Sequence, residues 1–154
     1  PKINYIKVSD IQTACSGSDI IVSATTAGKP LLLDIALDKG TTVIGVSEQL
    51  AYEVIEKYDK FIVDFAECLM DRQNQMGKYA AKVAGTGYVE LSPSLADGEL
   101  GDIIIEKIAG RQNDDEIILS CSVGMSVEDV MVAYEAYNCA IKKELGLKLE
   151  FIDI

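Results

Sequence analysis

The chain has 154 residues, with 14 Lys and Arg against 25 Asp and Glu, so its formal net charge at pH 7 is −11. An acidic surface repels phosphate backbones and anionic lipid headgroups, so we expect neither a nucleic-acid partner nor a membrane partner. The absence of histidine excludes Ser-His-Asp and Cys-His catalysis within this chain, and it excludes every histidine-containing zinc site. No metal site is expected. Hydrophobic residues make up 49% of the chain, as in an ordinary globular domain.

The cysteines and the first residue bear on the cellular setting. The four cysteines form no C-x-x-C pair. With no signal peptide before them, they predict reduced thiols and a cytoplasmic location. The chain begins at Pro1 without an initiator Met, which is typical of a processed, truncated or split product.

Short β-rich runs alternate with amphipathic stretches along the chain. Strands are predicted over residues 3–8, 19–24, 41–45, 60–65 and 116–120, and helices over 9–16, 47–58, 67–83, 99–109 and 126–145, with Ser9, Ser47 and Ser126 as N-caps. This alternation predicts an α/β fold with a mostly parallel sheet flanked by helices. The run 19–24 is compact and β-branched, which is typical of a strand buried on both faces. The tail 147–154 is strand-like.

The phosphate-binding signature of dinucleotide domains is missing. No G-x-G-x-x-G occurs, and the only G-x-G, Gly85-Thr86-Gly87, is better explained as a flexible loop. A doubly wound sheet that binds a dinucleotide carries this loop after its first strand. The predicted Rossmann-like sheet therefore lacks the first phosphate-binding βαβ unit.

Small and hydroxyl-bearing residues follow three of the predicted strands. They are Ser23-Ala24-Thr25, Gly45-Val46-Ser47 and Ser122-Val123. Ligand sites of α/β proteins form at the carboxyl ends of strands, and small side chains let a flat ring approach the backbone. Ordinary strand exits, with Ser47 as a helix N-cap, explain the first two patterns equally well. Cys121 has no histidine base and is interpreted as a structural thiol, and residues 114–116 as a solvated turn.

Four segments together resemble one family: 18–32, 41–54, 99–129 and the closing helix with its tail. The third is the most specific, with E-L-G, A-G-R, D-D-E-I, S-V-G and E-D in order. The chain resembles the ornithine cyclodeaminase and mu-crystallin family, whose members use NAD(P) as cyclodeaminases, alanine dehydrogenases and ketimine or pyrroline-carboxylate reductases. The resemblance covers nearly the whole chain but only about half of a family protein.

The resemblance implies a division of the chain. Residues 1–125 would form a partial NAD(P)-binding Rossmann-like domain, and residues 126–154 a helix and tail that return toward a missing N-terminal domain. That missing half, or a partner chain, would supply the phosphate grip and the substrate-binding residues, and a homo-oligomer is expected. The surfaces meant for that half should be exposed, above all the helical stripe Val130, Tyr134, Tyr137 and Ile141.

The resemblance also implies a cofactor site for NAD or NADP, lined by Ser23, Ala24, Thr25, Gly45, Val46, Ser47, Ser122 and Val123. Ser47 stands where cyclodeaminases carry a catalytic Asp, and ketimine reductases resemble this chain there. A serine with no histidine is a poor base, so imine reduction suits the chain better than cyclodeamination. The expected function is part of an NAD(P)-dependent oxidoreductase that acts on a small amino acid or its imine. The alternative is a non-catalytic binding or assembly module derived from the same family.

Overall fold

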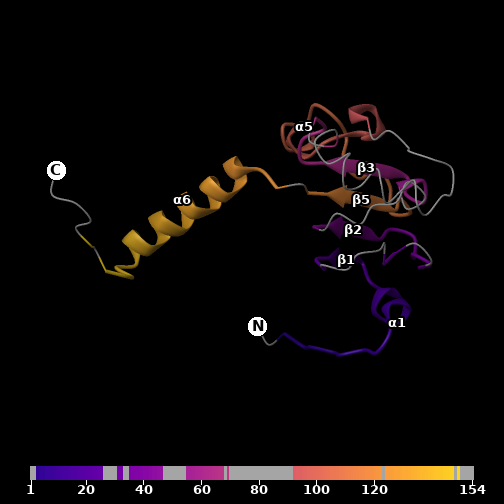
Figure 1. Cartoon of the computed structure of the whole chain (residues 1–154), viewed down its shortest axis with the longest axis horizontal. Coiled ribbons are helices and arrows are strands. Elements are labelled where there is room, and N and C mark those ends of the chain that lie inside the picture. Colours follow the sequence, from indigo (N-terminus) through magenta and orange to yellow (C-terminus); the bar gives the residue numbers. More distant parts are fainter. Residues whose placement is uncertain are drawn as a thin grey trace. The chain divides into compact units, whose positions relative to one another are not determined.

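The computed structural model describes residues 3–25, 31–32, 35–46, 55–67, 69, 92–122, 124–147 and 149. The chain divides into two compact units, residues 1–123 and 124–154. The first unit holds the sheet and the second holds one long helix (Figure 1). In the described part of the chain, no helix is both long enough and apolar enough to cross a membrane.

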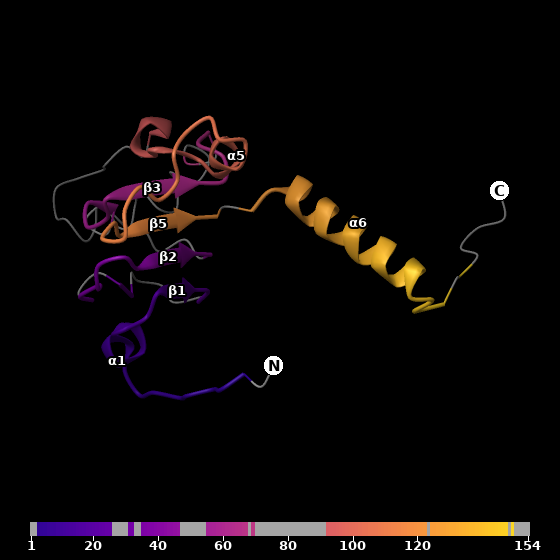
Figure 2. The same cartoon turned by 180° about the vertical axis from the view of Figure 1, so that it is seen from behind.

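The sheet of the first unit has five strands, all paired in parallel. They are β1 (Ile20–Ser23), β2 (Thr42–Gly45), β3 (Lys60–Val63), β4 (Gly98–Glu99) and β5 (Ile118–Cys121). Their order across the sheet is β1-β2-β5-β3-β4. Figures 1 and 2 show the sheet from opposite sides. The predicted parallel α/β fold is therefore confirmed, with β5 inserted between two strands that precede it in the chain.

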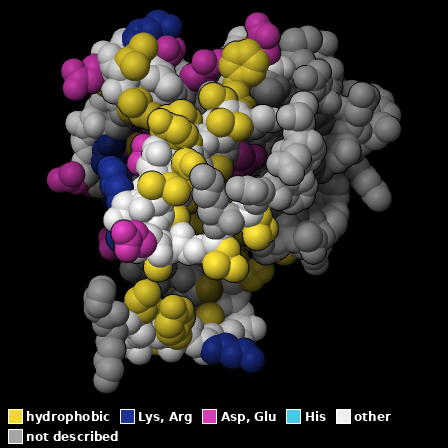
Figure 3. Space-filling view, turned by 90° about the vertical axis from the view of Figure 1, so that its left-hand side faces the viewer, with side chains coloured by type: hydrophobic (Ala, Val, Ile, Leu, Met, Phe, Trp, Pro, Cys, Tyr) yellow, Lys and Arg dark blue, Asp and Glu magenta, His cyan; other side chains and the backbone are white. Residues whose placement is uncertain are grey.

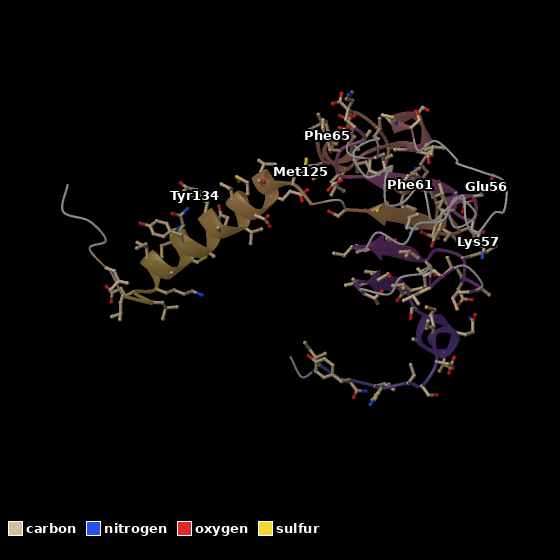
Figure 4. All side chains as sticks on the ribbon, in the orientation of Figure 1. Glu56, Lys57, Phe61, Phe65, Met125 and Tyr134 are labelled. Atoms are coloured by element: carbon tan, nitrogen blue, oxygen red, sulfur yellow. The ribbon has the colours of Figure 1, made fainter. Side chains whose placement is uncertain are left out.

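The core lies on the three central strands of this sheet. Val43 of β2, Phe61 of β3 and Leu119 of β5 are buried and pack in one cluster. Burial of each such side chain contributes about 1.5–3 kcal/mol. Figure 4 labels Phe61 within the first unit. Most residues of β3 and β5 are buried, whereas those of β2 alternate between half-buried and buried.

Strand β1 was predicted to be buried on both faces, but it is partly exposed. Ile20 and Val22 are 62% and 59% exposed. Within the described residues β1 is an edge strand, because β2 is the only strand that pairs with it. Apolar composition alone cannot distinguish an edge strand from a central one.

The segment before β1 also differs from expectation. Residues 3–8 form no strand, because no described strand lies beside them, and Tyr5 and Ile6 are exposed. Helix α1 (Ile11–Cys15) is capped by Asp10 and not by Ser9. The Asp10 carboxylate accepts hydrogen bonds from the amide and the hydroxyl of Thr13, at 2.8 and 2.7 Å, and a carboxylate is a strong N-cap acceptor.

The predicted helix 99–109 is shorter than expected. Glu99 belongs to β4, and helix α5 covers only Leu100–Ile104. Glu106 takes a left-handed φ of 61°, and the amides of Lys107 and Ile108 donate to the carbonyl oxygen of Asp102. A left-handed residue ends the helical hydrogen-bond ladder. A short 3-10 turn, η1 (Pro93–Leu95), precedes β4.

The A-G-R and D-D-E-I segments build the amino edge of the sheet. The Arg111 guanidinium donates to the Thr42 hydroxyl at 2.8 Å and to the carbonyl of Glu116. Lys60 forms an ion pair with Glu116 at 3.8 Å, and both side chains are largely buried. Lys39 pairs with Asp115 at 2.7 Å. The acidic turn 114–116 is thus tied to lysines on neighbouring elements.

The second unit holds helix α6 (Ser126–Lys142), which has no buried residue. Its N-cap is Met125 and not Ser126; the Met125 amide donates to the Glu128 carboxylate at 3.3 Å. The helix ends three residues before the predicted Leu145, since the backbone turns left-handed at Glu144. Residue 149 and the segment 144–147 form no strand. The rest of the predicted tail strand lies outside the described residues, as do most of the predicted helices 47–58 and 67–83 and the G-x-G at 85–87.

The predicted apolar stripe of α6 is exposed. Tyr134 is 57% exposed and its side chain projects from the helix in Figure 4. The other members, Val130, Tyr137 and Ile141, are at least as open. Figure 3 shows hydrophobic side chains over much of the face that it presents. A helix with an apolar stripe of this length is ordinarily covered by another element.

Candidate functional site

The carboxyl ends of the strands meet in one row. The register places Ser23 of β1 beside Gly45 of β2, and Gly45 beside Cys121 of β5. Cys121 in turn lies beside Val63 of β3. In parallel α/β sheets this edge is where ligands bind. The structure therefore brings three of the predicted segments to one place, although they lie far apart in the sequence.

Backbone hydrogen bonds hold these strand ends together. The Val46 amide donates to the carbonyl of Ser23 at 2.9 Å, and the Ser122 amide donates to the carbonyl of Gly45 at 3.1 Å. Val46, Ala24 and Thr25 continue past the strand ends and are exposed. The predicted Ser47 and Val123 lie outside the described residues. Six of the eight predicted residues are thus placed at or beside this edge.

Gly45 is a buried residue at the centre of the row. A β carbon built on Gly45 would lie 3.9 Å from its nearest neighbours, the Cys121 sulfur and the Ser120 carbonyl oxygen. That is ordinary van der Waals contact, so packing within the described chain does not require glycine here. By contrast, at Gly40 a β carbon would lie 2.5 Å from the carbonyl oxygen of Asp114. A methyl group would therefore fit at position 45 within the described structure, whereas it would clash at position 40.

Asp64 belongs to the site and was not among the predicted residues. It directly follows β3 and is only 6% exposed. One carboxylate oxygen accepts the Phe65 amide at 2.9 Å, and the other accepts the Ser122 hydroxyl at 3.2 Å. Phe65 is labelled in Figure 4. The sequence does carry a signal for Asp64, because a carboxylate directly after an apolar strand is placed at the carboxyl edge of the sheet.

Glu99 fixes the segment that carries Asp64. Glu99 pairs with Val63 across β4 and β3, and its carboxylate accepts the Ala66 amide at 2.9 Å. The E-L-G motif therefore supports the site from the neighbouring strand. Its glutamate binds backbone and holds the turn after β3 in one geometry.

Cys121 lies within the packed core. It is buried, and it belongs to the cluster that contains Val43 and Phe61. Its sulfur would lie 3.9 Å from a β carbon built on Gly45. This burial agrees with the prediction of a structural thiol, which packs as a small hydrophobic group.

A hollow of about 360 Å³ runs from this edge along β1 and α1. Ser23 and Thr25 line its end near the strand termini, and Ile11, Cys15 and Val22 line the rest. The lining is therefore mainly apolar, with hydroxyls from Ser18, Ser23 and Thr25. Ligand pockets are typically apolar with a few convergent polar groups.

The comparisons with known proteins agree on one family. The family model described as "Ornithine cyclodeaminase/mu-crystallin family" matches residues 2–144. The N-((2S)-2-amino-2-carboxyethyl)-L-glutamate dehydrogenase of Staphylococcus aureus is 30% identical over 97% of this chain and 43% of its own length. A Delta(1)-pyrroline-2-carboxylate reductase of Bacillus cereus is 32% identical, with 92% of this chain and 43% of the relative covered.

A solved structure shows the same relation in three dimensions. The Thermococcus litoralis Delta(1)-pyrroline-2-carboxylate reductase, in complex with NADH and L-proline, is 27% identical and superposes with a TM-score of 0.69. The match covers 92% of this chain and 44% of that one. The chain thus spans less than half the length of the relatives that it matches. With its parallel sheet, its strand-end site and the family match over nearly all its residues, the chain belongs to the ornithine cyclodeaminase/mu-crystallin family.

Proposed function

We propose that this chain is part of an NAD(P)-dependent oxidoreductase that acts on a small amino acid or its imine. The observation that carries the proposal is the row of strand ends, where small and hydroxyl-bearing residues let a ligand approach the backbone. A flat ring needs such an approach to the backbone. The relative complexed with NADH and L-proline supports the same reading.

The residues that would hold the nicotinamide end of the cofactor are those predicted from the resemblance. Ser23, Ala24, Gly45 and Val46 would form one wall from β1 and β2, and Ser122 would close the site from β5. Thr25, Ser47 and Val123 complete the proposed set. The cofactor, when bound, supplies hydride transfer. The protein residues orient the reacting groups and limit their contact with water.

Imine reduction fits the chemistry of these side chains. The proposed reaction adds hydride to the imine carbon and one proton to the nitrogen. Serine at position 47 is too weak a base to take part in proton removal from an amine, so the proton would come from solvent or from the protonated imine itself. The residues that bind the cofactor phosphates and those that bind the substrate carboxylate would come from sequence beyond this chain or from a partner chain. A cytoplasmic homo-oligomer completes the proposal.

The test measures both binding and turnover, with the natural protein that carries this sequence. NADH or NADPH is titrated into the protein, and oxidation of the reduced nicotinamide is followed with Delta(1)-pyrroline-2-carboxylate, the substrate in the name of a relative. The reverse reaction is followed with L-proline and L-alanine. We expect binding of a reduced dinucleotide and its oxidation by an imine.

The alternative is a binding or assembly module without catalysis. The relatives named above are a dehydrogenase and reductases, which gives this alternative no support. Dinucleotide binding without turnover of any imine or amino acid would favour it. Failure to bind either dinucleotide would refute the proposed function.

A further inference from the structure

Asp64 and Ser122 form a polar pair at the centre of the strand-end row. The two residues follow β3 and β5 directly, and the last residues of those strands are register partners. Both oxygens of the buried Asp64 carboxylate accept a hydrogen bond, one from the Phe65 amide and one from the Ser122 hydroxyl. Ser122 is also bound through its amide to Gly45. The backbone of Ser122 is therefore held against Gly45 and its hydroxyl against a buried acceptor.

We propose that Asp64 is a positioning residue that makes the Ser122 hydroxyl a hydrogen-bond acceptor for an N–H group of the ligand. An ionised carboxylate has only acceptor sites, so the hydroxyl must be the donor in their contact. A serine hydroxyl has a single hydrogen. Once that hydrogen points at Asp64, only the oxygen lone pairs remain for a ligand. Ser122 then selects ligands that present a donor.

The inference rests on the proposed function, which supplies two ligands with suitable N–H groups. One is the carboxamide of the nicotinamide ring, and the other is the nitrogen of a protonated imine or amine. Both present the same chemistry to the Ser122 oxygen. The protonated nitrogen is a charged donor and would form the stronger hydrogen bond, and the carboxamide is a neutral donor. The experiment distinguishes them.

The decisive variant is Asp64→Asn. The Phe65 amide still requires an acceptor, so the asparagine oxygen stays on that side and its NH2 group faces Ser122 at the 3.2 Å contact. The NH2 group donates to the hydroxyl oxygen, and the hydroxyl hydrogen turns toward the ligand. The substitution therefore reverses the polarity of the Ser122 hydroxyl. It keeps the number of non-hydrogen atoms in the side chain at position 64 and removes one negative charge.

Two pairs of probes read this polarity by dissociation constants. The first pair is NADH and its reduced 3-acetylpyridine analogue, in which a methyl group replaces the carboxamide NH2. The second pair, measured with NADH bound, is L-proline and tetrahydrofuran-2-carboxylate, in which oxygen replaces the ring nitrogen. All are measured with the natural protein that carries this sequence and with its variants.

For each pair we compare the dissociation constant of the analogue with that of the N–H compound, as a ratio. In one pair this ratio should be roughly three- to tenfold larger in the unaltered protein than in Ser122→Ala. Asp64→Asn should remove or reverse this preference. Combined with Ser122→Ala, Asp64→Asn should leave the preference unchanged, because the coupling requires the hydroxyl. Asp115→Asn, which removes a carboxylate at the amino edge of the sheet, should keep the preference of the unaltered protein.

The outcomes separate the two ideas. A change confined to the first pair identifies the carboxamide, and a change confined to the second identifies the substrate nitrogen. Equal weakening of both members of each pair by Asp64→Asn would mean that Asp64 is only structural, and would overturn the inference. If Asp64→Asn fails to fold, an unchanged preference in Ser122→Ala would overturn it instead. If the unaltered protein binds neither dinucleotide, the proposed function itself fails and the inference falls with it.

Discussion

Substitution of Gly45 by alanine separates folding from ligand binding at the strand-end row. The new β carbon would lie 3.9 Å from its nearest neighbours, so it creates no clash within the described chain. Glycine in a strand interior is destabilising by about 0.5–1 kcal/mol relative to alanine. We therefore expect Gly45→Ala to raise the free energy of unfolding by that amount. For a chain of this length, the melting temperature should rise by about 1–4 °C.

The effect on the cofactor should have the opposite sign. A methyl group at Gly45 would stand where the proposed nicotinamide ring approaches the backbone. An extra methyl group in a filled contact costs about 1–3 kcal/mol, which corresponds to roughly 5- to 150-fold in the dissociation constant of the dinucleotide. The melting temperature should therefore rise while the affinity for the dinucleotide falls. A substitution that merely damages the fold would lower both.

The assay combines thermal unfolding with titration of NADH and NADPH. Gly101→Ala is the matched control: Gly101 lies in α5 and no atom comes within 4 Å of its built β carbon, so this variant should be at least as stable and bind normally. Unchanged dinucleotide affinity in Gly45→Ala would refute the placement of the ring. A lower melting temperature in Gly45→Ala would show that a methyl group does not fit at this position.

Three other predictions concern Gly40, Tyr58 and the apolar stripe of α6. Gly40→Ala should destabilise the chain by about 2–4 kcal/mol in denaturant unfolding, since φ is +80° and the new β carbon would meet the Asp114 carbonyl at 2.5 Å; a loss below about 1 kcal/mol would contradict this. Within the described residues the buried Tyr58 hydroxyl has no hydrogen-bond partner, so Tyr58→Phe should stabilise by about 1 kcal/mol at neutral pH. The pKa of Tyr58 is raised from 10.0 to about 12, mainly by burial and then by the nearby cysteine thiol. The folded state therefore favours the neutral phenol. This preference stabilises the fold fully below pH 10.0 and is lost as pH rises through about 12. Tyr58→Phe should remove that part of the alkaline fall in the free energy of unfolding, and an unchanged alkaline profile would count against it. Changing Tyr134 and Tyr137 of α6 to serine should reduce self-association of the 154-residue chain in light scattering, whereas an unaltered chain that stays monomeric at high concentration would show that the stripe drives no association.

Much of the fold follows from local patterns. The runs at 20–23 and 42–45 became strands because β-branched residues suit a pleated, covered surface. The alternation of strands with amphipathic segments implies parallel pairing. Helix ends were less predictable. Asp10 displaced Ser9 as a cap, and Glu106 ended α5 early, because neighbouring residues compete for the same backbone groups.

The sequence by itself determined the fold class, the family and which segments carry small residues at strand ends. Only the tertiary structure decided which of those ends are neighbours. Insertion of β5 between β2 and β3 places Ser122 against Gly45 and against Asp64, 58 residues away in the chain. It likewise leaves β1 with a single described neighbour, so that an apolar strand is exposed. Strand order depends on long-range pairing, and no local pattern of residues encodes a partner so distant in sequence.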